Sequence, residues 1–225
     1  MGKSLLVLLR HGQSVWNAKN LFTGWVDIPL SQKGIQEALN AGKAIQHIDF
    51  QVIYVSSLAR AQLTAMLAMS VHDEGRVPCV MHPGEGKLDD WDKSYGDQNL
   101  IPMHVAWELN ERMYGKLQGM NKDDARAKFG KEQVHTWRRS FATPPPDGES
   151  LKDTADRTLP YFKKHIMPHL ERGENVLISA HGNSLRAILM ELDQLSEDEV
   201  VQLEVPTGQP ICYTYADKTF EKQTL

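Results

Sequence analysis

Short apolar runs and stretches of helical periodicity alternate along this chain. Continuous apolar runs that stop at polar or turn-forming residues predict buried strands at residues 4–9, 50–55, 77–81, 175–180 and 210–215. Apolar side chains at helical spacing predict helices at residues 32–48, 58–71, 123–129, 132–140, 151–170 and 183–192. Strands that alternate with helices of this length indicate βαβ units, and therefore a mainly parallel sheet covered by helices on both faces.

Serine residues mark the starts of several predicted helices. Ser31 and Ser150 stand immediately before two of them, where a hydroxyl oxygen can accept from a free backbone N–H group. Ser196, followed three residues later by Glu199, predicts a capping box at the start of a last short helix. The helix at residues 32–48 is expected to bury the residues at helical spacing along it, namely Ile35, Leu39, Gly42 and Ile45.

The segment at about residues 82–106 interrupts this alternation. Glycine, proline and aspartate are frequent in it, so we expect an irregular excursion or a lid there. No composition shift, internal repeat or low-complexity tract marks a domain boundary. Residues 1–225 are therefore expected to form a single α/β domain with this one excursion.

The composition argues against several classes of protein. With 225 residues, of which 41% are hydrophobic, the chain can bury a sizeable core. A net charge of −4 argues against a nucleic-acid-binding protein, and no apolar run is long enough to span a membrane. Cys79 and Cys212 do not make a disulfide framework, and the first strand begins without a signal peptide, so we expect a cytoplasmic protein.

Two predicted strands end in a histidine followed by glycine. The first strand runs into Arg10-His11-Gly12, and a later strand ends at His181. Ligands of open α/β sheets bind at the carboxyl ends of the strands, so the two imidazoles are expected at one site. Arg10 and Arg60, which follows the second strand, can offer guanidinium groups that match phosphate oxygens. This pattern predicts that one imidazole attacks a phosphate and the other steadies it. An ordinary strand-end histidine is the alternative.

Backbone groups near the first strand can add to a phosphate site. Gly12, Ser14 and Asn17 lie where the strand turns into a helix, and free N–H groups at a helix N-terminus attract anions. Thr23 and Gly24, in the following loop, can contribute a hydroxyl group and an amide. A plain turn explains this last pair equally well.

Glu111 is the candidate for proton transfer. It lies in a polar, aromatic segment that is a poor core element, and its carboxyl group can exchange a proton with an oxygen of the substrate. That role needs a pKa nearer neutrality, which burial or a nearby phosphate would supply. A solvated glutamate paired with Arg112 is the alternative, and Glu108 is a weaker candidate for the same role.

A second group of basic residues follows along the chain: Arg112, Lys122, Arg138 and Arg139. A doubly phosphorylated acid is strongly anionic and requires a second anion site at its other end. On spacing alone, a solvated helix face explains Arg138 and Arg139 slightly better. The histidines lack the spacing of a zinc helix, and the chain has no P-loop and no dinucleotide fingerprint, so no metal is expected.

These residues lie in motifs that resemble those of the histidine phosphatase superfamily, and within it those of the cofactor-dependent phosphoglycerate mutases. The similar motifs cover nearly the whole chain: Arg10-His11-Gly12, residues 21–25, 109–112, 114–119, 137–139 and 180–186, and Pro206-Thr207-Gly208. The resemblance implies a three-layer α/β/α sandwich with a mainly parallel central sheet, as in phosphoglycerate mutases.

The resemblance also assigns roles to residues. It implies that His11 is the phosphorylated histidine and that Glu111 is the acid and base. It implies that Arg10, Arg60 and His181 bind the transferring phosphoryl group. The positions that match the family's ligand contacts are Ser14, Asn17, Thr23, Gly24, Arg112, Tyr114, Lys122, Arg138, Arg139, Gly182 and Asn183.

The implied reaction is the interconversion of 3-phosphoglycerate and 2-phosphoglycerate in glycolysis and gluconeogenesis, primed by 2,3-bisphosphoglycerate and without a metal. The family is compatible with a homodimer or a homotetramer. Gln13 stands where the family more often has glutamate, residues 144–149 are brief, and Leu225 follows soon after the last predicted strand. These departures leave a histidine phosphatase acting on small phosphorylated metabolites as the runner-up, and a catalytically silent binding protein as a third hypothesis.

Overall fold

The central element is a seven-stranded sheet with the strand order β3-β4-β2-β5-β1-β6-β7. The computed structural model describes residues 2–73, 75–94 and 99–225. The strands are β1 Ser4–Arg10, β2 Val52–Ser56, β3 Val77–Val80, β4 Leu100–Ala106, β5 Val176–Ala180, β6 Pro210–Ala216 and β7 Thr219–Gln223. The first five strands in this order, from β3 to β1, pair in parallel. β6 pairs antiparallel with β1, and β7 pairs antiparallel with β6. The sheet is thus mainly parallel, as predicted.

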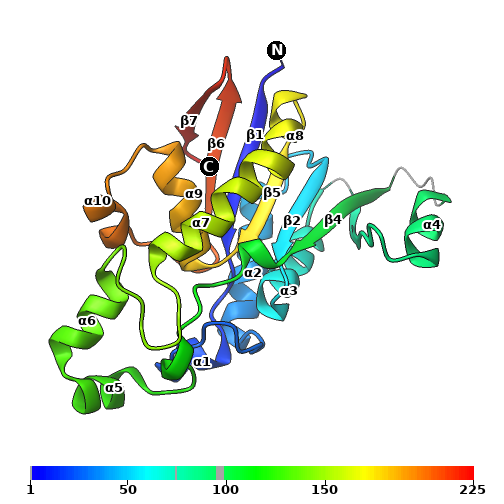
Figure 1. Ribbon diagram of the computed structural model, residues 1–225. Helices are drawn as coiled ribbons and strands as arrows, with labels where there is room; N and C mark the ends of the chain where they lie inside the picture. Colours follow the sequence, from blue (N-terminus) through cyan, green and yellow to red (C-terminus); the bar gives the residue numbers. More distant parts are fainter. Residues whose placement is uncertain (1, 74, 95–98) are drawn as a thin grey trace.

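Helices cover both faces of this sheet (Figure 1). The helices are α1 Val15–Ala18, α2 Gln32–Ile45, α3 Ala59–Met69, α4 Lys87–Ser94, α5 Lys122–Phe129, α6 Lys131–Arg139, α7 Leu151–Tyr161, α8 Met167–Glu171, α9 Gly182–Leu192 and α10 Glu197–Gln202. A π-helical turn, Phe162–Ile166, joins α7 to α8. α2 and α3 lie on one face, and α7, α8 and α9 on the other, which gives the three layers expected of this α/β fold.

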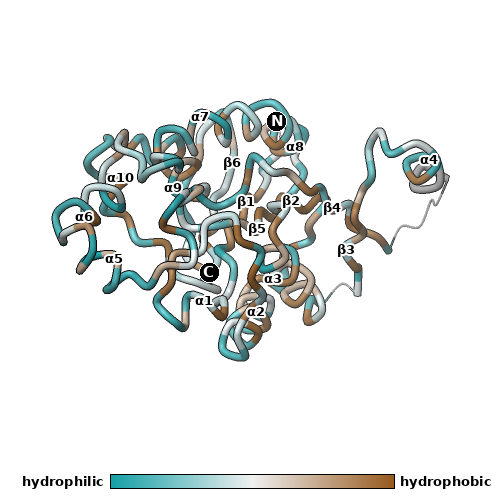
Figure 2. The backbone as a smooth tube through the Cα atoms, turned by 60° about the horizontal axis from the view of Figure 1, so that its bottom comes forward, coloured by the Kyte–Doolittle hydropathy of each residue, from teal (hydrophilic) through white to brown (hydrophobic). Residues whose placement is uncertain are grey.

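The core is divided by the sheet into two clusters. Leu6 and Leu8 of β1 pack toward α9, whereas Val7 and Leu9 face α2 and α3. All four side chains are fully buried, because a strand covered on both faces has no solvent side. Figure 2 shows the consequence: the hydrophobic backbone colour concentrates on the central strands, and much of α5, α6 and α10 is hydrophilic. Among the described residues, no helix is long and apolar enough to cross a membrane.

The predicted helix caps are confirmed. Ser31 accepts a hydrogen bond from the Gly34 N–H group at the start of α2. Ser150 and Ser196 both form capping boxes, at α7 and α10. These side chains satisfy N–H groups that the first helical turn leaves free, which fixes where each helix begins.

The expected buried face of α2 is wrong in part. Ile35 and Leu39 are only partly buried, and the fully covered line is small: Gly34, Ala38, Ala41, Gly42 and Ile45. A Cβ atom on Gly34 would lie 2.1 Å from the Gln13 carbonyl oxygen, and one on Gly42 would lie 2.2 Å from that of Ala68. Close approach of backbones, rather than hydrophobic bulk, therefore sets the inner face of this helix.

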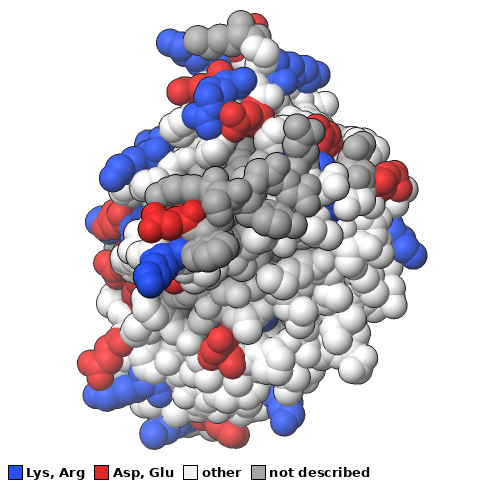
Figure 3. Space-filling model, turned by 90° about the vertical axis from the view of Figure 1, so that its right-hand side faces the viewer, with Lys and Arg blue, Asp and Glu red and all other residues white. Residues whose placement is uncertain are grey.

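The expectation of an irregular excursion at residues 82–106 is wrong for Leu100–Ala106, which form β4 between β3 and β2. Pro102 lacks an N–H group for strand pairing, so its presence in the sequence argued against a strand here. Residues 95–98 of the same segment lie outside the described residues. α4 lies beyond the β3 edge, on the opposite side of the molecule from α5 and α6 (Figure 1). Figure 3 shows this end face-on, with acidic and basic side chains interspersed rather than gathered into one basic surface.

The last strand, β7, was not predicted. Asp217 and Lys218 have positive φ angles of 49° and 64°, which build the tight hairpin turn between β6 and β7. Most of β7 is exposed, and it lacks the apolar alternation that would have revealed it. The sheet therefore contains one more strand after the last predicted one, which was expected to end at residue 215.

Candidate active site

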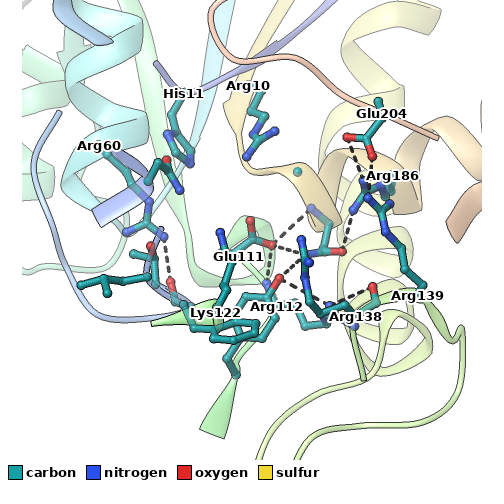
Figure 4. Close-up of a pocket in the computed structure, with 18 residues that line it drawn as sticks. Arg10, His11, Arg60, Glu111, Arg112, Lys122, Arg138, Arg139, Arg186 and Glu204 are labelled. Atoms are coloured by element: carbon teal, nitrogen blue, oxygen red, sulfur yellow. Dashed lines mark hydrogen bonds and ion pairs between the residues drawn. The ribbon is translucent and has the colours of Figure 1, made fainter. Parts of the chain in front are cut away.

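A pocket opens at the carboxyl ends of the central parallel strands (Figure 4). Arg10 is the last residue of β1, Arg60 lies in the first turn of α3 after β2, and Gly182 begins α9 after β5. Seven cationic side chains line the pocket: Arg10, Arg60, Arg112, Lys122, Arg138, Arg139 and Arg186. The carboxylates on its wall are Glu111 and Glu204. This excess of positive charge predicts an anionic ligand.

His11 is held as a neutral imidazole. The residue is 2% exposed, and Nδ1 lies 2.7 Å from the Gly12 carbonyl oxygen, an acceptor, so Nδ1 carries the proton. Nε2 is then unprotonated and free to attack. Burial, followed by Arg60 and Arg10, holds the pKa of His11 well below its ordinary value. Gly12 is required here, because a Cβ atom would lie 2.2 Å from the Gly34 carbonyl oxygen.

His181 lies beside His11, with ring centroids 4.9 Å apart. Its Nε2 is 2.7 Å from the Ser56 hydroxyl oxygen, which already accepts from the Leu58 N–H group at 3.2 Å. The Ser56 hydroxyl can then donate to Nε2, which leaves the proton of His181 on Nδ1. Burial, followed by Arg60 and His11, keeps the pKa of His181 well below its ordinary value. His181 is thus a neutral hydrogen-bond donor.

Arg10 and Arg60 are anchored by backbone carbonyl groups. Arg60 donates to Gly24 at 2.7 Å and to Val26 at 2.9 Å, and Arg10 donates to Val205 at 2.6 Å. Burial lowers the pKa of Arg60 to about 10, and the carboxylates of Glu111 and Asp27 offset this shift only in part. Both guanidinium groups are therefore fixed in place, and each keeps an Nε–H group without a hydrogen-bond partner among the described residues.

Several buried donors in this region have no partner. Among the described residues, the buried side-chain nitrogen and oxygen atoms without a hydrogen bond belong to Arg76, to four residues of the pocket wall and to His181, which lies beside His11. Apart from Arg76 Nε, they are Arg10 Nε, Thr23 Oγ1, Arg60 Nε, Arg112 Nε and His181 Nδ1. Buried polar atoms are rarely left unsatisfied in proteins, since each costs free energy. Those of Arg10, Arg60 and His181 belong to residues next to His11, and they fit the oxygens of a phosphoryl group.

Glu111 faces the same space and is 8% exposed. Its Oε1 accepts from the Arg112 N–H group at 2.8 Å, and from the backbone and side-chain amides of Asn183 at 3.2 and 2.8 Å. Oε2 accepts no hydrogen bond from the described part of the chain. The carboxylate is therefore oriented through one oxygen and offers the other for proton exchange.

The expected rise in the pKa of Glu111 is not found without a ligand. Burial does raise this pKa, but Arg10, the Asn183 and Arg112 hydrogen bonds and Arg60 outweigh burial, so the pKa lies below its ordinary value. A bound phosphate would offset the charge of Arg10 and Arg60. The proton affinity of Glu111 therefore depends on the pocket being filled.

The outer end of the pocket gathers the second basic group. Arg112 is 1% exposed and donates to the Trp137 carbonyl oxygen at 3.0 Å. Lys122 begins α5, and Arg138 and Arg139 end α6. Burial and then Arg138 lower the pKa of Lys122, as expected for cations crowded without a counter-ion. Arg138 is partly buried and lines the pocket, which contradicts a merely solvated helix face.

Most of the predicted ligand contacts lie on the pocket wall, including Asn17, Thr23, Gly24, Tyr114, Gly182 and Asn183. Ser14 does not: it is fully buried, and its hydroxyl group caps α1 by accepting from the Asn17 N–H group at 3.0 Å. Glu108 is also absent from the wall. Among the described residues, no group of three or more His, Cys, Asp or Glu side chains could hold a metal ion.

The sequence interpretation missed other wall residues. Leu21 and Phe22 add apolar surface, and Arg186 and Glu204 add an ion pair at the mouth. Arg186 lies three positions after Asn183 on α9, so helical spacing alone offered a signal. Glu204 precedes the motif that begins at Pro206 and is brought to the pocket only by folding.

Comparison with known proteins agrees with this geometry. The family model described as "Histidine phosphatase superfamily (branch 1)" matches residues 6–92 and 93–225. A protein from Protochlamydia amoebophila named 2,3-bisphosphoglycerate-dependent phosphoglycerate mutase is 58% identical over 221 residues, which cover 97% of this chain and 98% of that relative. A protein of the same name from Chlamydia muridarum is 53% identical over 222 residues, covering 99% and 98%.

Solved structures are similar in fold. The phosphoglycerate mutase of Bacillus anthracis superposes with a TM-score of 0.69 at 21% identity, covering 100% of this chain and 93% of that structure. Bacillus stearothermophilus YhfR gives a TM-score of 0.76 at 24% identity, covering 97% and 95%. The family match over nearly the whole length, together with the paired histidines at the strand ends, shows that the chain belongs to branch 1 of the histidine phosphatase superfamily.

Proposed function

We propose that the protein is an isomerase that interconverts 3-phosphoglycerate and 2-phosphoglycerate in glycolysis and gluconeogenesis through a phosphohistidine at His11. The observation that carries this assignment is the two-ended pocket. A buried site for the transferring phosphoryl group surrounds His11, and a second cationic cluster lies across Glu111 from it. A substrate with anionic groups at both ends fits this arrangement, and it matches the name of relatives more than half identical to the chain.

Phosphohistidine formation begins with attack by Nε2 of His11 on the phosphorus atom. A nitrogen–phosphorus bond forms as the bond between phosphorus and the substrate oxygen breaks, and Glu111 Oε2 delivers a proton to that leaving oxygen. Arg10, Arg60 and the His181 Nδ1–H group stabilise the charge on the phosphoryl oxygens. Covalent catalysis of this kind divides one difficult transfer into two easier ones.

The reverse transfer uses the same groups. Glu111 Oε2 removes the proton from the free hydroxyl group of a monophosphoglycerate as that oxygen attacks phosphorus. The bond to His11 Nε2 breaks, and the imidazole returns to its neutral state. The outer cluster of Arg112, Lys122, Arg138 and Arg139 holds the remaining anionic groups, so the pocket can present either hydroxyl position to His11.

Priming by 2,3-bisphosphoglycerate belongs to the same proposal. The orphaned donors around His11 and the outer cluster give a phosphate-sized anion site at each end, so the residues fit that molecule. When bound, it supplies the first phosphoryl group. The proposal also includes a cytoplasmic enzyme, supported by two free thiols, and a homodimer or a homotetramer, which sedimentation would test.

A phosphatase on the same scaffold is the second candidate. Residues 144–149 pack against the loop at Gly115 rather than over the pocket, since the Pro146 carbonyl oxygen accepts from the Lys116 N–H group at 3.0 Å. Neither that segment nor β7 contributes to the pocket wall. Water therefore has a route to phospho-His11 that a longer covering loop would restrict.

The deciding experiment measures conversion of 3-phosphoglycerate to 2-phosphoglycerate in the presence of a chelator, with and without a trace of 2,3-bisphosphoglycerate. Conversion that depends on the trace supports the phosphohistidine mutase. Steady release of inorganic phosphate without isomerisation would assign the phosphatase instead.

A further inference from the structure

We infer that Arg157, paired with Glu149, is a positioning residue that sets where the carboxyl group of Glu111 lies in the pocket. The inference rests on the proposed role of Glu111 as acid and base. Arg157 lies on α7, and its side chain is 9% exposed. Neither Arg157 nor Glu149 lines the pocket, so each acts through another residue.

One guanidinium group holds three carbonyl groups of the segment that carries Glu111. Arg157 Nη1 donates to the Glu108 carbonyl oxygen at 2.7 Å, and Nη2 donates to those of Asn110 and Glu111, each at 3.1 Å. The segment contains only short 3₁₀ turns and has no sheet ladder of its own. Its backbone position therefore depends on these side-chain hydrogen bonds.

Glu149 binds both Arg157 and the backbone that follows Glu111. Its two oxygens accept from Arg157 Nε and Nη2, both at 2.9 Å, in a forked pair. Oε2 also accepts from the Met113 N–H group at 2.9 Å. The pair thus ties the segment at both ends, before Glu111 through carbonyl groups and after it through an amide.

Two indole rings confine the guanidinium group. Its central carbon lies 5.6 Å from the centroid of the Trp25 ring and 6.0 Å from that of Trp107. The Trp25 indole N–H group also donates to the Glu111 carbonyl oxygen. The peptide of Glu111 is therefore fixed on one side by Arg157 and Trp25, and its carboxylate on the other side by Asn183.

A lysine cannot replace this arrangement. Its ammonium group is a single point, whereas the guanidinium fork reaches three carbonyl groups and a carboxylate at once. The hydrogen bonds of Arg157 go to the segment that carries Glu111 and not to Arg10, Arg60 or His181, and lysine keeps the positive charge that helps to lower the pKa of His181. The substitution should therefore impair proton transfer and leave attack by His11 intact. A displacement of about 1 Å at a reacting group costs on the order of 100-fold in rate.

The test compares two phosphoryl donors with Arg157→Lys. A p-nitrophenolate leaving group departs without a proton, so its pre-steady-state burst reports His11 phosphorylation alone. The alkyl oxygen of a phosphoglycerate needs the proton from Glu111. We expect Arg157→Lys to lower kcat for isomerisation by roughly 100-fold, with KM and the aryl burst each within about threefold of wild type.

Two variants support the comparison. Arg172→Lys, at an exposed ion pair with Glu174, is the matched control and should change neither rate. Glu149→Gln should show the same selective loss to a smaller degree, and it carries the test if Arg157→Lys does not fold. Equal losses of the burst and the isomerisation, or no loss in either, would overturn the inference. If wild type hydrolyses but does not isomerise, glycerol phosphate replaces phosphoglycerate, so the inference is judged apart from the proposed function.

Discussion

The two ends of the pocket are built by different parts of the molecule. The inner end takes Arg10, His11 and His181 from the carboxyl ends of β1 and β5. The apolar residues of these two strands belong to the two core clusters on either face of the sheet. The outer end takes its cations from α5, α6 and the preceding loop. These elements pack around a small separate cluster, made of Phe22, Leu117, Ala125 and Val134.

Because the two ends are built differently, the proposed reacting groups lie at the inner end and the proposed binding groups lie at the outer end. At the inner end a rigid sheet holds neutral histidines and fixed donors at positions where a small displacement would cost rate. At the outer end several partly exposed cations would bind the same anion, so each contributes only a modest part of the binding free energy. Substitutions at the two ends should therefore change different kinetic constants.

The largest effect is expected from His11→Ala. Removal of the nucleophile should abolish acid-labile phosphorylation by 2,3-bisphosphoglycerate and lower kcat by at least about 10⁴-fold. Radiolabel transfer to the protein measures the first quantity. His47→Ala, at an exposed position, is the control. Labelling of the His11 variant at the wild-type level would remove His11 from its role.

Glu111→Gln should follow, with a loss of about 10²- to 10⁴-fold in isomerisation. The amide keeps the size of the side chain and can still accept from Asn183, but it cannot exchange a proton. Stopped-flow measurement of the p-nitrophenolate burst should show near wild-type phosphorylation of His11. A burst reduced as much as the isomerisation would mean that Glu111 serves phosphate binding rather than proton transfer.

Arg138→Ala tests the outer end. Loss of a charge-assisted hydrogen bond should raise KM for 3-phosphoglycerate by about 10- to 100-fold, while the aryl phosphate burst changes little. Steady-state kinetics on both substrates give the comparison, with Arg172→Ala as the control at an exposed site. Equal losses on the two substrates would show that the outer cluster is not a distal anion site.

The smallest effect is a pH dependence of stability that belongs to the inner end. Both histidines have pKa values well below the ordinary value, so below about pH 6.5 the unfolded chain binds more protons than the folded one. Stability is then full above that pH and falls as the pH decreases, with a limiting slope of about 1.4 kcal/mol per pH unit for each histidine. His104, whose pKa burial also lowers, adds in the same direction.

Urea unfolding of the unphosphorylated protein at pH 7.5, 6.5 and 5.5 measures this dependence. His11→Asn should reduce the slope by the share of one histidine, and His47→Asn should leave it unchanged. An unaltered slope in the His11 variant would mean that His11 is not held neutral in the folded state.

Much of the inner end was predictable from local sequence. An apolar run that stops at a histidine and a glycine specifies a buried strand and places the imidazole at its carboxyl end, because strand pairing leaves little other freedom. Serine caps and strand-forming runs likewise carry their signal within a few residues, and the observed β1, β5 and α7 agree with them.

The outer end and the fine electrostatics were decided by tertiary structure. Glu204 lies on the pocket wall through contacts that no local pattern contains. Ser14 is an error of a different kind, because its hydroxyl group caps α1 through a local hydrogen bond with the Asn17 N–H group and is therefore not offered to the pocket. The pKa of Glu111 depends on Arg10 and Arg60, which lie far away in sequence, and their charge outweighs burial. β4 contains a proline, and the buried face of α2 contains glycines, so the strand and the buried face of that helix are recognisable only from their neighbours. The sequence by itself determined the residue types proposed to carry the chemistry and their places at strand ends, since both are local properties. Only the tertiary structure decided their protonation, their partners and their orientation, since these arise from charges and backbones brought together by folding.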